Sequence, residues 1–388
     1  MRWKSAVSEL RSLPDAIVQC ADEVDSDPDL AVVFVSAHFE EALDLVPPLL
    51  RTHIGNSVTL GCLGGGVIGA GREIEGRPGV AISTALFPDV EVVPFHVQDE
   101  ILPDGDASPD AWETLVGVEG SSGPSLMMLA SPFNFATDKL IAGLDYAFPS
   151  SSKIGGIASG STVTGQNLLF DGSHVYGEGA LGIALMGNVT IDTVVAQGCR
   201  PIGDAMQITA CQGNVLHELD GDSPIDILNA LYQDLGDRDQ KLVRHSLFIG
   251  MVMDPFNDDP KLGDFLIRNI LGADQDQGAL VISEMLSDGQ TVQFHLRDAE
   301  ASSYDLDAML TRYATEKPIY EETGALLFSC LGRGEYLYGR PDHDTDMFRE
   351  KINAMPLTGF FCNGEIGPVG GTTFMHGYTS SFGIFRPR

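Results

Sequence analysis

The sequence has few basic residues and no long apolar run. Of its 388 residues, 23 are lysine or arginine and 55 are aspartate or glutamate, so the formal net charge at pH 7 is −32. This excess of negative charge repels phosphate backbones and anionic lipid headgroups. No stretch reaches the roughly 18 apolar residues that a membrane-spanning helix needs. We therefore expect neither nucleic acid nor a membrane among the partners of this chain.

The sequence also lacks a CxxC pair and a secretion signal. Its six cysteines are scattered along the chain, and reduced thiols in a cytoplasm are the simplest interpretation of that pattern. The first 20 residues carry charges but no apolar core of the kind found in signal peptides. Trp3, Val7 and Leu10 recur near helical spacing, which predicts an amphipathic N-terminal helix within residues 1–29.

Common nucleotide-binding and metal-binding motifs are absent or incomplete. No GK[ST] tripeptide occurs, which excludes a P-loop. GGGVIG (64–69) matches G-x-G-x-x-G, but the following AGREIEGRPG predicts a β-hairpin instead of the helix that a dinucleotide site needs. DHDTD (342–346) concentrates possible metal ligands, and we favour an acidic loop that caps a helix. We expect no cofactor and no metal ion.

An internal repeat is the main positive feature of the sequence. Each copy begins with an apolar run of strand length, continues through a helical stretch and ends in a second strand with a glycine-rich turn. The copies cover residues 31–69, 125–161 and 325–367, and a weaker fourth copy is expected from SLFIGMVMDPF (246–256). Repetition of one supersecondary unit predicts an α/β (mixed α+β) fold of two lobes, built from strand–helix–strand–hairpin units with mixed sheets.

The boundary between the two lobes is expected near residue 223. Ser223 has the character of a helix N-cap, and Pro224 and Asp226 are favoured in a first helical turn. The predicted organisation is an N-terminal helix (1–29), a first α/β domain (30–222) and a second α/β domain (223–388).

Polar side chains gather where two strands of the third copy end. They are Cys330, Arg333, Cys362, Asn363, Gly364 and Glu365. Because the carboxyl ends of neighbouring strands meet at one sheet edge, we expect these side chains to share a crevice. A free α-amino acid would fit such a crevice, with Arg333 binding its carboxylate and Glu365 its ammonium group. A structural ion pair between Arg333 and Glu365 is the alternative that the residues leave open.

Two further questions concern the thiols and the first copy. Cys330 and Cys362 are either small buried strand-end residues or reactive thiols whose pKa a cation such as Arg333 lowers. Ser36 and His38 occupy the matching strand-end position of the first copy and are candidates for lining a second ligand-binding crevice.

Five strings of the sequence resemble the FIST proteins, in which a FIST N domain is followed by a FIST C domain. The N part carries VSAHF (35–39) and GCLGGGVIGAGREIE (61–75). The C part carries RDAEASSYDL (297–306), LLFSCLGRG (326–334) and PLTGFFCNGEIGP (356–368). The resemblance spans roughly residues 30 to 370. The tail VGGTTFMHGYTSSFGIF is similar to stand-alone bacterial members, cyanobacterial ones in particular.

This resemblance implies a cytoplasmic sensory module that binds a small ligand, such as an amino acid or a related metabolite, and is not an enzyme. It also implies roles for Arg333 and Glu365. The 29 residues before the first repeat are too few for an F-box, and nothing follows the C part, so a signal would pass to a partner protein.

Two alternative functions remain at this point. One is an interaction scaffold whose acidic face or strand edge recruits a signalling protein. The other is a thiol-dependent hydrolase or transferase that uses Cys330 or Cys362, with His376 or His38 as the base.

Overall fold

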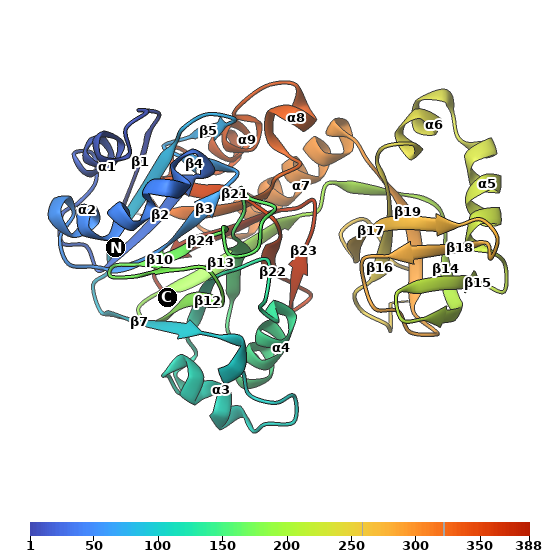
Figure 1. Ribbon diagram of the computed structural model, residues 1–388, viewed down its shortest axis with the longest axis horizontal. Helices are drawn as coiled ribbons and strands as arrows, with labels where there is room; N and C mark the ends of the chain where they lie inside the picture. The colour runs from blue at the N-terminus through green and yellow to red at the C-terminus, as the bar shows by residue number, and fades with distance from the viewer. Residues whose placement is uncertain (258, 321–322) are drawn as a thin grey trace. The chain divides into compact units, whose positions relative to one another are not determined.

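The computed structural model describes residues 1–257, 259–320 and 323–388. It divides into two compact units, coloured along the chain in Figure 1. The three-copy unit comprises residues 1–195, 307–375 and 379–388, and the barrel unit comprises residues 196–306 and 376–378. The α/β class with mixed sheets is confirmed. The compact units divide the chain differently from the expected boundary at residue 223, because the barrel unit is inserted into the third copy.

The three-copy unit contains the three predicted repeats, each with an edge strand ahead of it. Copy one consists of β1 (Arg2–Ser8), α1 (Leu13–Ala21), β2 (Leu30–Ser36), the 3-10 helix η1 (Ala37–Leu45), α2 (Val46–His53), β3 (Val58–Gly64), β4 (Gly66–Gly69), β5 (Arg72–Glu75) and β6 (Val80–Leu86). Copy two consists of β7 (Val90–Val97), η2 (Asp99–Ile101), α3 (Pro109–Val116), η3 (Gly120–Ser122), β8 (Ser125–Ala130), α4 (Thr137–Ala147), β9 (Lys153–Ile157), β10 (Leu169–Asp171), β11 (Val175–Tyr176) and β12 (Ala180–Gly187). Copy three consists of β13 (Thr190–Ala196), α7 (Ala299–Glu316), β20 (Ala325–Cys330), α8 (Gly334–Tyr338), α9 (His343–Lys351), β21 (Leu357–Cys362), β22 (Glu365–Val369), β23 (Thr372–His376) and β24 (Ser380–Arg386).

Each copy builds the first four strands of its own six-stranded sheet and receives a hairpin from another copy. The strand orders are β1-β6-β2-β3-β10-β11, β7-β12-β8-β9-β22-β23 and β13-β24-β20-β21-β4-β5. The hairpin of copy one thus joins copy three, that of copy three joins copy two, and that of copy two joins copy one. The hairpin predicted after GGGVIG is confirmed as β4–β5. The exchange of hairpins closes the three copies into a ring.

A glycine in the second strand of each copy allows the central parallel pair to form. Gly61, Gly155 and Gly359 lie opposite Val33, Met128 and Leu327 in register. A Cβ atom on any of the three glycines would lie between 1.8 and 2.4 Å from the carbonyl oxygen of its partner. The repeated glycine is therefore a packing requirement of the fold.

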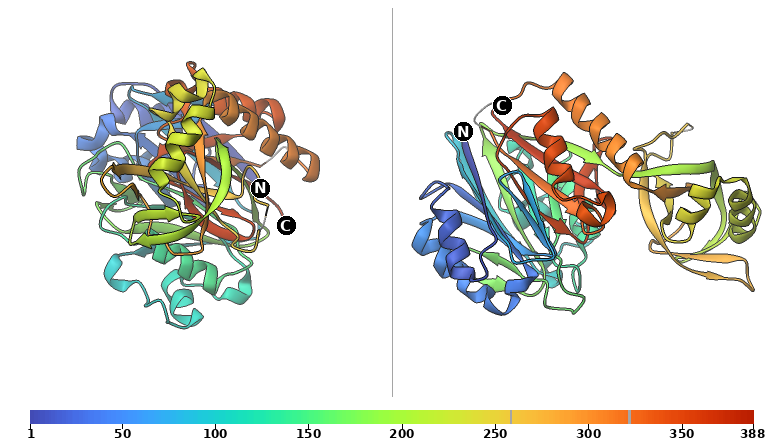
Figure 2. Two further views of the ribbon diagram at one scale, coloured as in Figure 1. Left: turned by 90° about the vertical axis from the view of Figure 1, so that its right-hand side faces the viewer. Right: turned by 90° about the horizontal axis from the view of Figure 1, so that it is seen from above.

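The central strands of the three-copy unit are covered on both faces. β2, β8 and β20 are buried along their whole length, as continuous apolar runs predict. One face contributes to a shared core that includes Phe34, Met127 and Phe328 from the three copies. The opposite faces pack against helices, which are α1 and α2 in copy one and α3 and α4 in copy two. The chain termini lie close together in both views of Figure 2.

The barrel unit differs from the expected fourth copy. Its strands form a closed barrel in the order β14-β15-β18-β17-β16-β19, and its elements are β14 (Cys199–Gln212), β15 (Val215–Leu219), α5 (Pro224–Asp234), α6 (Asp237–Val243), β16 (Leu247–Val252), β17 (Phe265–Asp274), β18 (Ala279–Ile282) and β19 (Thr291–Arg297). The string at 246–256 forms β16, which pairs antiparallel with β17 and β19. The expectation of a fourth copy is therefore wrong, although the Ser223 cap of α5 is confirmed.

The N-terminal segment also differs from the prediction of a helix. Residues 2–8 form strand β1, which pairs antiparallel with β6 along its whole length. The helix begins only at Leu13, where the Ser12 side chain accepts a hydrogen bond from Asp15 N. Tertiary pairing with β6 thus overrides the helical spacing of the apolar residues. Among the described residues, no helix combines the length and the apolar character needed to cross a membrane.

Candidate functional site

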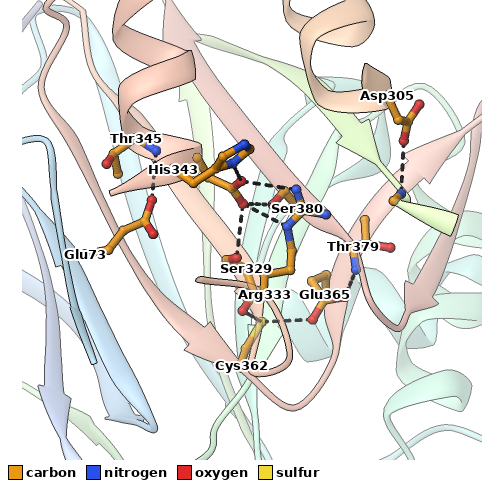
Figure 3. Close-up of polar contacts among 12 residues, drawn as sticks. Glu73, Asp305, Ser329, Arg333, His343, Thr345, Cys362, Glu365, Thr379 and Ser380 are labelled. Atoms are coloured by element: carbon orange, nitrogen blue, oxygen red, sulfur yellow. Dashed lines mark hydrogen bonds and ion pairs between the residues drawn. The ribbon is translucent and has the colours of Figure 1, made fainter. Parts of the chain in front are cut away.

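The carboxyl ends of β20 and β21 bring the predicted residues of copy three together. Cys330 and Cys362 are partners in the parallel register. The chain then turns, with Leu331 N donating to Cys362 O at 3.0 Å and Arg333 N donating to Cys330 O at 2.9 Å. The turn directs the Arg333 side chain into the interior, and Figure 3 shows it among the same group of polar contacts as Glu365. Both side chains are completely buried, at 0% exposure.

The carboxylate of Asp344, in the first turn of α9, binds the guanidinium of Arg333. Arg333 Nε lies 2.8 Å from Asp344 Oδ2, and Nη2 lies 3.2 Å from Oδ1. Asp344 is 1% exposed. This two-point contact is the strongest geometry for an arginine–carboxylate pair. The guanidinium of Arg333 is thus bound by an aspartate that is not among the site residues predicted from the sequence.

Three neighbouring side chains also bind the Asp344 carboxylate. Ser380 Oγ donates to Oδ2 at 2.6 Å, and His343 Nδ1 lies 2.9 Å from Oδ1. Ser329 Oγ lies at the limit of hydrogen-bonding distance, 3.5 Å from Oδ2. Burial alone would raise the pKa of Asp344, but the charge of Arg333 and these hydrogen bonds hold that pKa well below its usual range. Asp344 is therefore ionised, and the charge on each partner stabilises the other.

Two stacked aromatic rings contact this ion pair. The rings of Tyr338 and His343 stack with their centroids 3.4 Å apart and their planes 8° from parallel. The guanidinium carbon of Arg333 lies 5.6 Å from the centroid of Tyr338, which is within the range of a cation–π interaction. Each ring of the aromatic pair thus contacts one partner of the ion pair, Tyr338 the guanidinium and His343 the carboxylate.

Glu365 holds the second half of the strand-end cluster. Its Oε2 accepts a hydrogen bond from Thr379 N at 3.0 Å, and its Oε1 lies 3.4 Å from Cys362 Sγ. Cys362 Sγ also lies 3.3 Å from Ser329 O. Burial, and then the charge of Glu365, raise the pKa of the Cys362 thiol well above its usual value. A thiol held in the protonated form is a poor nucleophile.

Asn363 and Gly364 join copy three to copy two. Asn363 Nδ2 donates to Ala158 O at 3.0 Å, and Asn363 N donates to Ile157 O at 3.0 Å. Ile157 N donates in turn to Gly364 O at 2.8 Å. These residues position the strand ends of two sheets against each other.

Ser36 and His38 lie at the strand end of copy one. Ser36 Oγ accepts a hydrogen bond from Gly79 N at 2.9 Å, and Ser36 N donates to Gly79 O at 2.9 Å. Ser36 is fully buried, whereas His38 is exposed in η1. The structure thus places both residues at the end of β2, in a different sheet from Arg333 and Glu365.

The DHDTD string contributes to the site differently from the prediction of an acidic helix cap. Asp342 precedes α9 with φ of 59°, and its side chain makes no capping hydrogen bond to the helix. The Glu73 carboxylate, from β5 of copy one, accepts the hydrogen bond of Thr345 N at 2.9 Å instead. The accumulation of acidic residues was the available sequence signal for Asp344. No group of three or more His, Cys, Asp or Glu side chains within the described residues is placed to hold a metal ion.

Two protein-family models match this chain, one after the other along the sequence. The FIST N domain family model matches residues 29–222, and the FIST C domain family model matches residues 226–368. An uncharacterized protein of Mycobacterium tuberculosis is 36% identical over 359 residues, which cover 92% of this chain and 91% of that protein. An uncharacterized protein of Mycobacterium bovis is 34% identical over 373 residues, covering 96% and 94% respectively.

A plant protein shares part of the sequence. An F-box/LRR-repeat protein of Arabidopsis thaliana is 30% identical over 167 residues, which cover 41% of this chain and 31% of the plant protein. The two family models together cover both halves of the chain, and the bacterial relatives match it over nearly their whole length. The chain therefore belongs to the FIST family, with a FIST N domain followed by a FIST C domain.

Proposed function

We propose that this chain is a cytoplasmic sensory protein that binds an α-amino acid or a related metabolite at the strand ends of copy three and signals through a partner protein. FIST domains are generally described as sensory domains in signal transduction. The buried thiols Cys20, Cys62 and Cys362 fit a reducing compartment. The ligand class and its site are the finer parts of the proposal.

The observation that carries this proposal is the burial of opposite charges at the ends of two adjacent parallel strands. Arg333, Asp344 and Glu365 are each at most 1% exposed. A buried ion pair contributes little net stability, because desolvation offsets most of the attraction. Clusters of ionisable groups with shifted pKa values are typical of functional sites. The carboxyl edge of an α/β sheet is also the usual place for a ligand.

The geometry supports a specific exchange of carboxylates. Asp344 occupies the two-point fork of Arg333, where the carboxylate of an amino acid would bind. Glu365, directed to the same strand end, would accept the ligand ammonium group. A ligand that takes the place of Asp344 would release the first turn of α9, which carries Asp344. Binding would thereby change the position of a helix and provide a signal for a partner.

The proposal is tested by thermal unfolding of the protein with a panel of amino acids and related metabolites. A ligand at about 100 times its Kd should stabilise the fold by about 2.7 kcal/mol. The double variant Arg333→Met/Asp344→Leu should abolish this stabilisation. Because it removes both partners of the ion pair, it leaves neither of them buried and unpaired.

The matched control is Arg386→Met/Asp192→Leu, which removes another two-point ion pair of the same unit. This control should retain the ligand response. The proposal would be contradicted if no compound of the panel changed the unfolding temperature. An unchanged response in the Arg333→Met/Asp344→Leu variant would also contradict it.

A further inference from the structure

A hollow of about 270 Å³ lies where the β4–β5 hairpin of copy one meets α8 and α9 of copy three. It is lined by Glu73, Glu75, Arg77, Glu335 and Pro341. Arg77, Glu335 and Pro341 are exposed, and Glu73 is 2% exposed. The hollow therefore has an open rim and a buried acidic floor.

Glu73 has one oxygen that is bonded and one that is not. Its Oε1 accepts a hydrogen bond from Thr345 N at 2.9 Å, as Figure 3 shows. Its Oε2 is buried and has no hydrogen-bond partner. A buried polar atom without a partner is unfavourable and uncommon in folded proteins. The unpartnered oxygen belongs to a side chain that lines the hollow, so a ligand donor that reached it would be stabilised.

Glu75 adds a second carboxylate to the wall of the hollow. Its Oε1 accepts a hydrogen bond from Glu335 N at 2.9 Å. A Cβ atom at Gly334 would lie 2.3 Å from Glu75 Oε1, and Gly334 has a φ of +65°. Glycine at this position therefore allows the carboxylate to approach the backbone. The single cation of the lining, Arg77, is held by Glu9 through an ion pair of 2.9 Å.

We propose that this hollow binds a small organic cation with an ammonium or guanidinium group, one N–H of which donates to Glu73 Oε2. Glu75 and Glu335 would bind the remaining donors. The inference does not depend on the proposed sensory function, because the hollow is lined by other residues than the Arg333–Glu365 strand ends.

An organic cation fits this hollow better than a metal ion. Within the described part of the chain, no three acidic, histidine or cysteine side chains are close enough to hold one ion. The hollow of about 270 Å³ is also far larger than the roughly 30 Å³ that one water molecule occupies in the liquid. A molecule with several N–H donors could reach carboxylates that a single ion could not.

Binding should depend on pH through Glu73. Burial, and then the negative charge of Asp344, raise the pKa of Glu73 to about 8. Glu75 and Asp342 act in the same direction, while Thr345 N favours the ionised form. A cation binds the ionised carboxylate, so its affinity should rise by up to about tenfold per pH unit between about pH 6.5 and the pKa of Glu73.

The test is calorimetric titration of the whole protein with putrescine and with agmatine at constant ionic strength, at about pH 6.5 and about pH 8.5. Tighter binding at the higher pH is expected. Glu73→Gln should weaken binding at the higher pH by about tenfold or more and remove most of the pH dependence. If Glu73→Gln does not fold, Glu335→Gln is measured in its place. This change at the exposed rim should also weaken binding.

The control variant is Glu113→Gln, which alters a glutamate that also accepts one backbone hydrogen bond, from Gly120 N at 2.9 Å. It should bind both amines as the unmodified protein does. Equal affinity for tetramethylammonium, which has no N–H donor, would overturn the proposal, because binding would then reflect charge alone. The proposal would also be overturned if Glu73→Gln and Glu335→Gln both bound the amines as tightly as the unmodified protein. Displacement of the amines by an equal concentration of Mg²⁺ would overturn it as well.

Discussion

Copies one and three end their central strands with the same backbone hydrogen bond but with different side chains. Ser36 N donates to Gly79 O at 2.9 Å, and Cys330 N donates to Thr379 O at 3.0 Å. In copy one the returning amide, Gly79 N, is bound by the Ser36 hydroxyl. In copy three the corresponding amide, Thr379 N, is bound by the Glu365 carboxylate.

This difference separates what the repeat needs from what one copy has added. A short neutral side chain is sufficient to close the strand end of copy one. At the equivalent strand end, copy three has the charged side chains of Glu365, Arg333 and Asp344, although the backbone geometry does not require charge there. Copy three therefore carries charges that the shared backbone geometry does not need, and three changes test this comparison.

The largest effect is expected from Asp344→Ala. This change removes the carboxylate that binds the buried Arg333 at two points. Removal of one partner from a buried ion pair costs about 3–5 kcal/mol. The free energy of unfolding, measured in urea, should fall by that amount. Arg333→Met/Asp344→Leu should cost much less, and an equal loss in both variants would contradict a specific ion-pair effect.

A smaller effect is expected from Ser36→Ala in copy one. The change leaves the buried amide of Gly79 without its acceptor, which costs about 1–3 kcal/mol. The same urea experiment measures the loss, and Ser36→Thr should restore part of the stability because it keeps the hydroxyl. A loss as large as that of Asp344→Ala would remove the distinction between the two copies.

The third change concerns a pH dependence carried by Glu73, which links copy one to copy three. Its pKa is raised from 4.5 to about 8, chiefly by burial. The folded state therefore favours the protonated acid, so the stabilisation is complete below pH 4.5 and is lost as the pH rises to about 8. Relative to Glu73→Gln, the unmodified protein should lose at most about 1.4 kcal/mol per pH unit in that interval. A constant difference between the two proteins would contradict the raised pKa.

The repeats of the fold are predictable from sequence, and their connections are not. Runs such as AVVFVS (31–36) and ALLFSC (325–330) are apolar throughout, which is typical of strands buried on both faces. The four residues of β4 carry no local signal for their partner, and only the assembled ring pairs them with β21. SLFIGMVM (246–253) has the same apolar character, so its place in a barrel could not be read from periodicity.

The candidate site is likewise only partly predictable from the sequence. The positions of Arg333 and Glu365 after neighbouring strands are predictable, because parallel strands end at one edge. The pairing of Arg333 with Asp344 is not, since Glu365 and several acidic residues of DHDTD are equally available in sequence. Only the orientation of α9 selects Asp344. Glu73 could not be selected because the hairpin that carries it belongs to another copy.

The exchange of hairpins among the three copies limits how this chain can be divided. Deleting copy two would remove β10–β11 from the edge of β3 and leave β22–β23 without β9. Exposed strand edges of this kind promote aggregation. The six barrel strands, by contrast, all lie between β13 and α7 of copy three, and residues 376–378 add a second, short segment to the barrel unit. The barrel strands therefore come from one continuous stretch of the sequence, whereas each sheet of the ring combines strands of two copies.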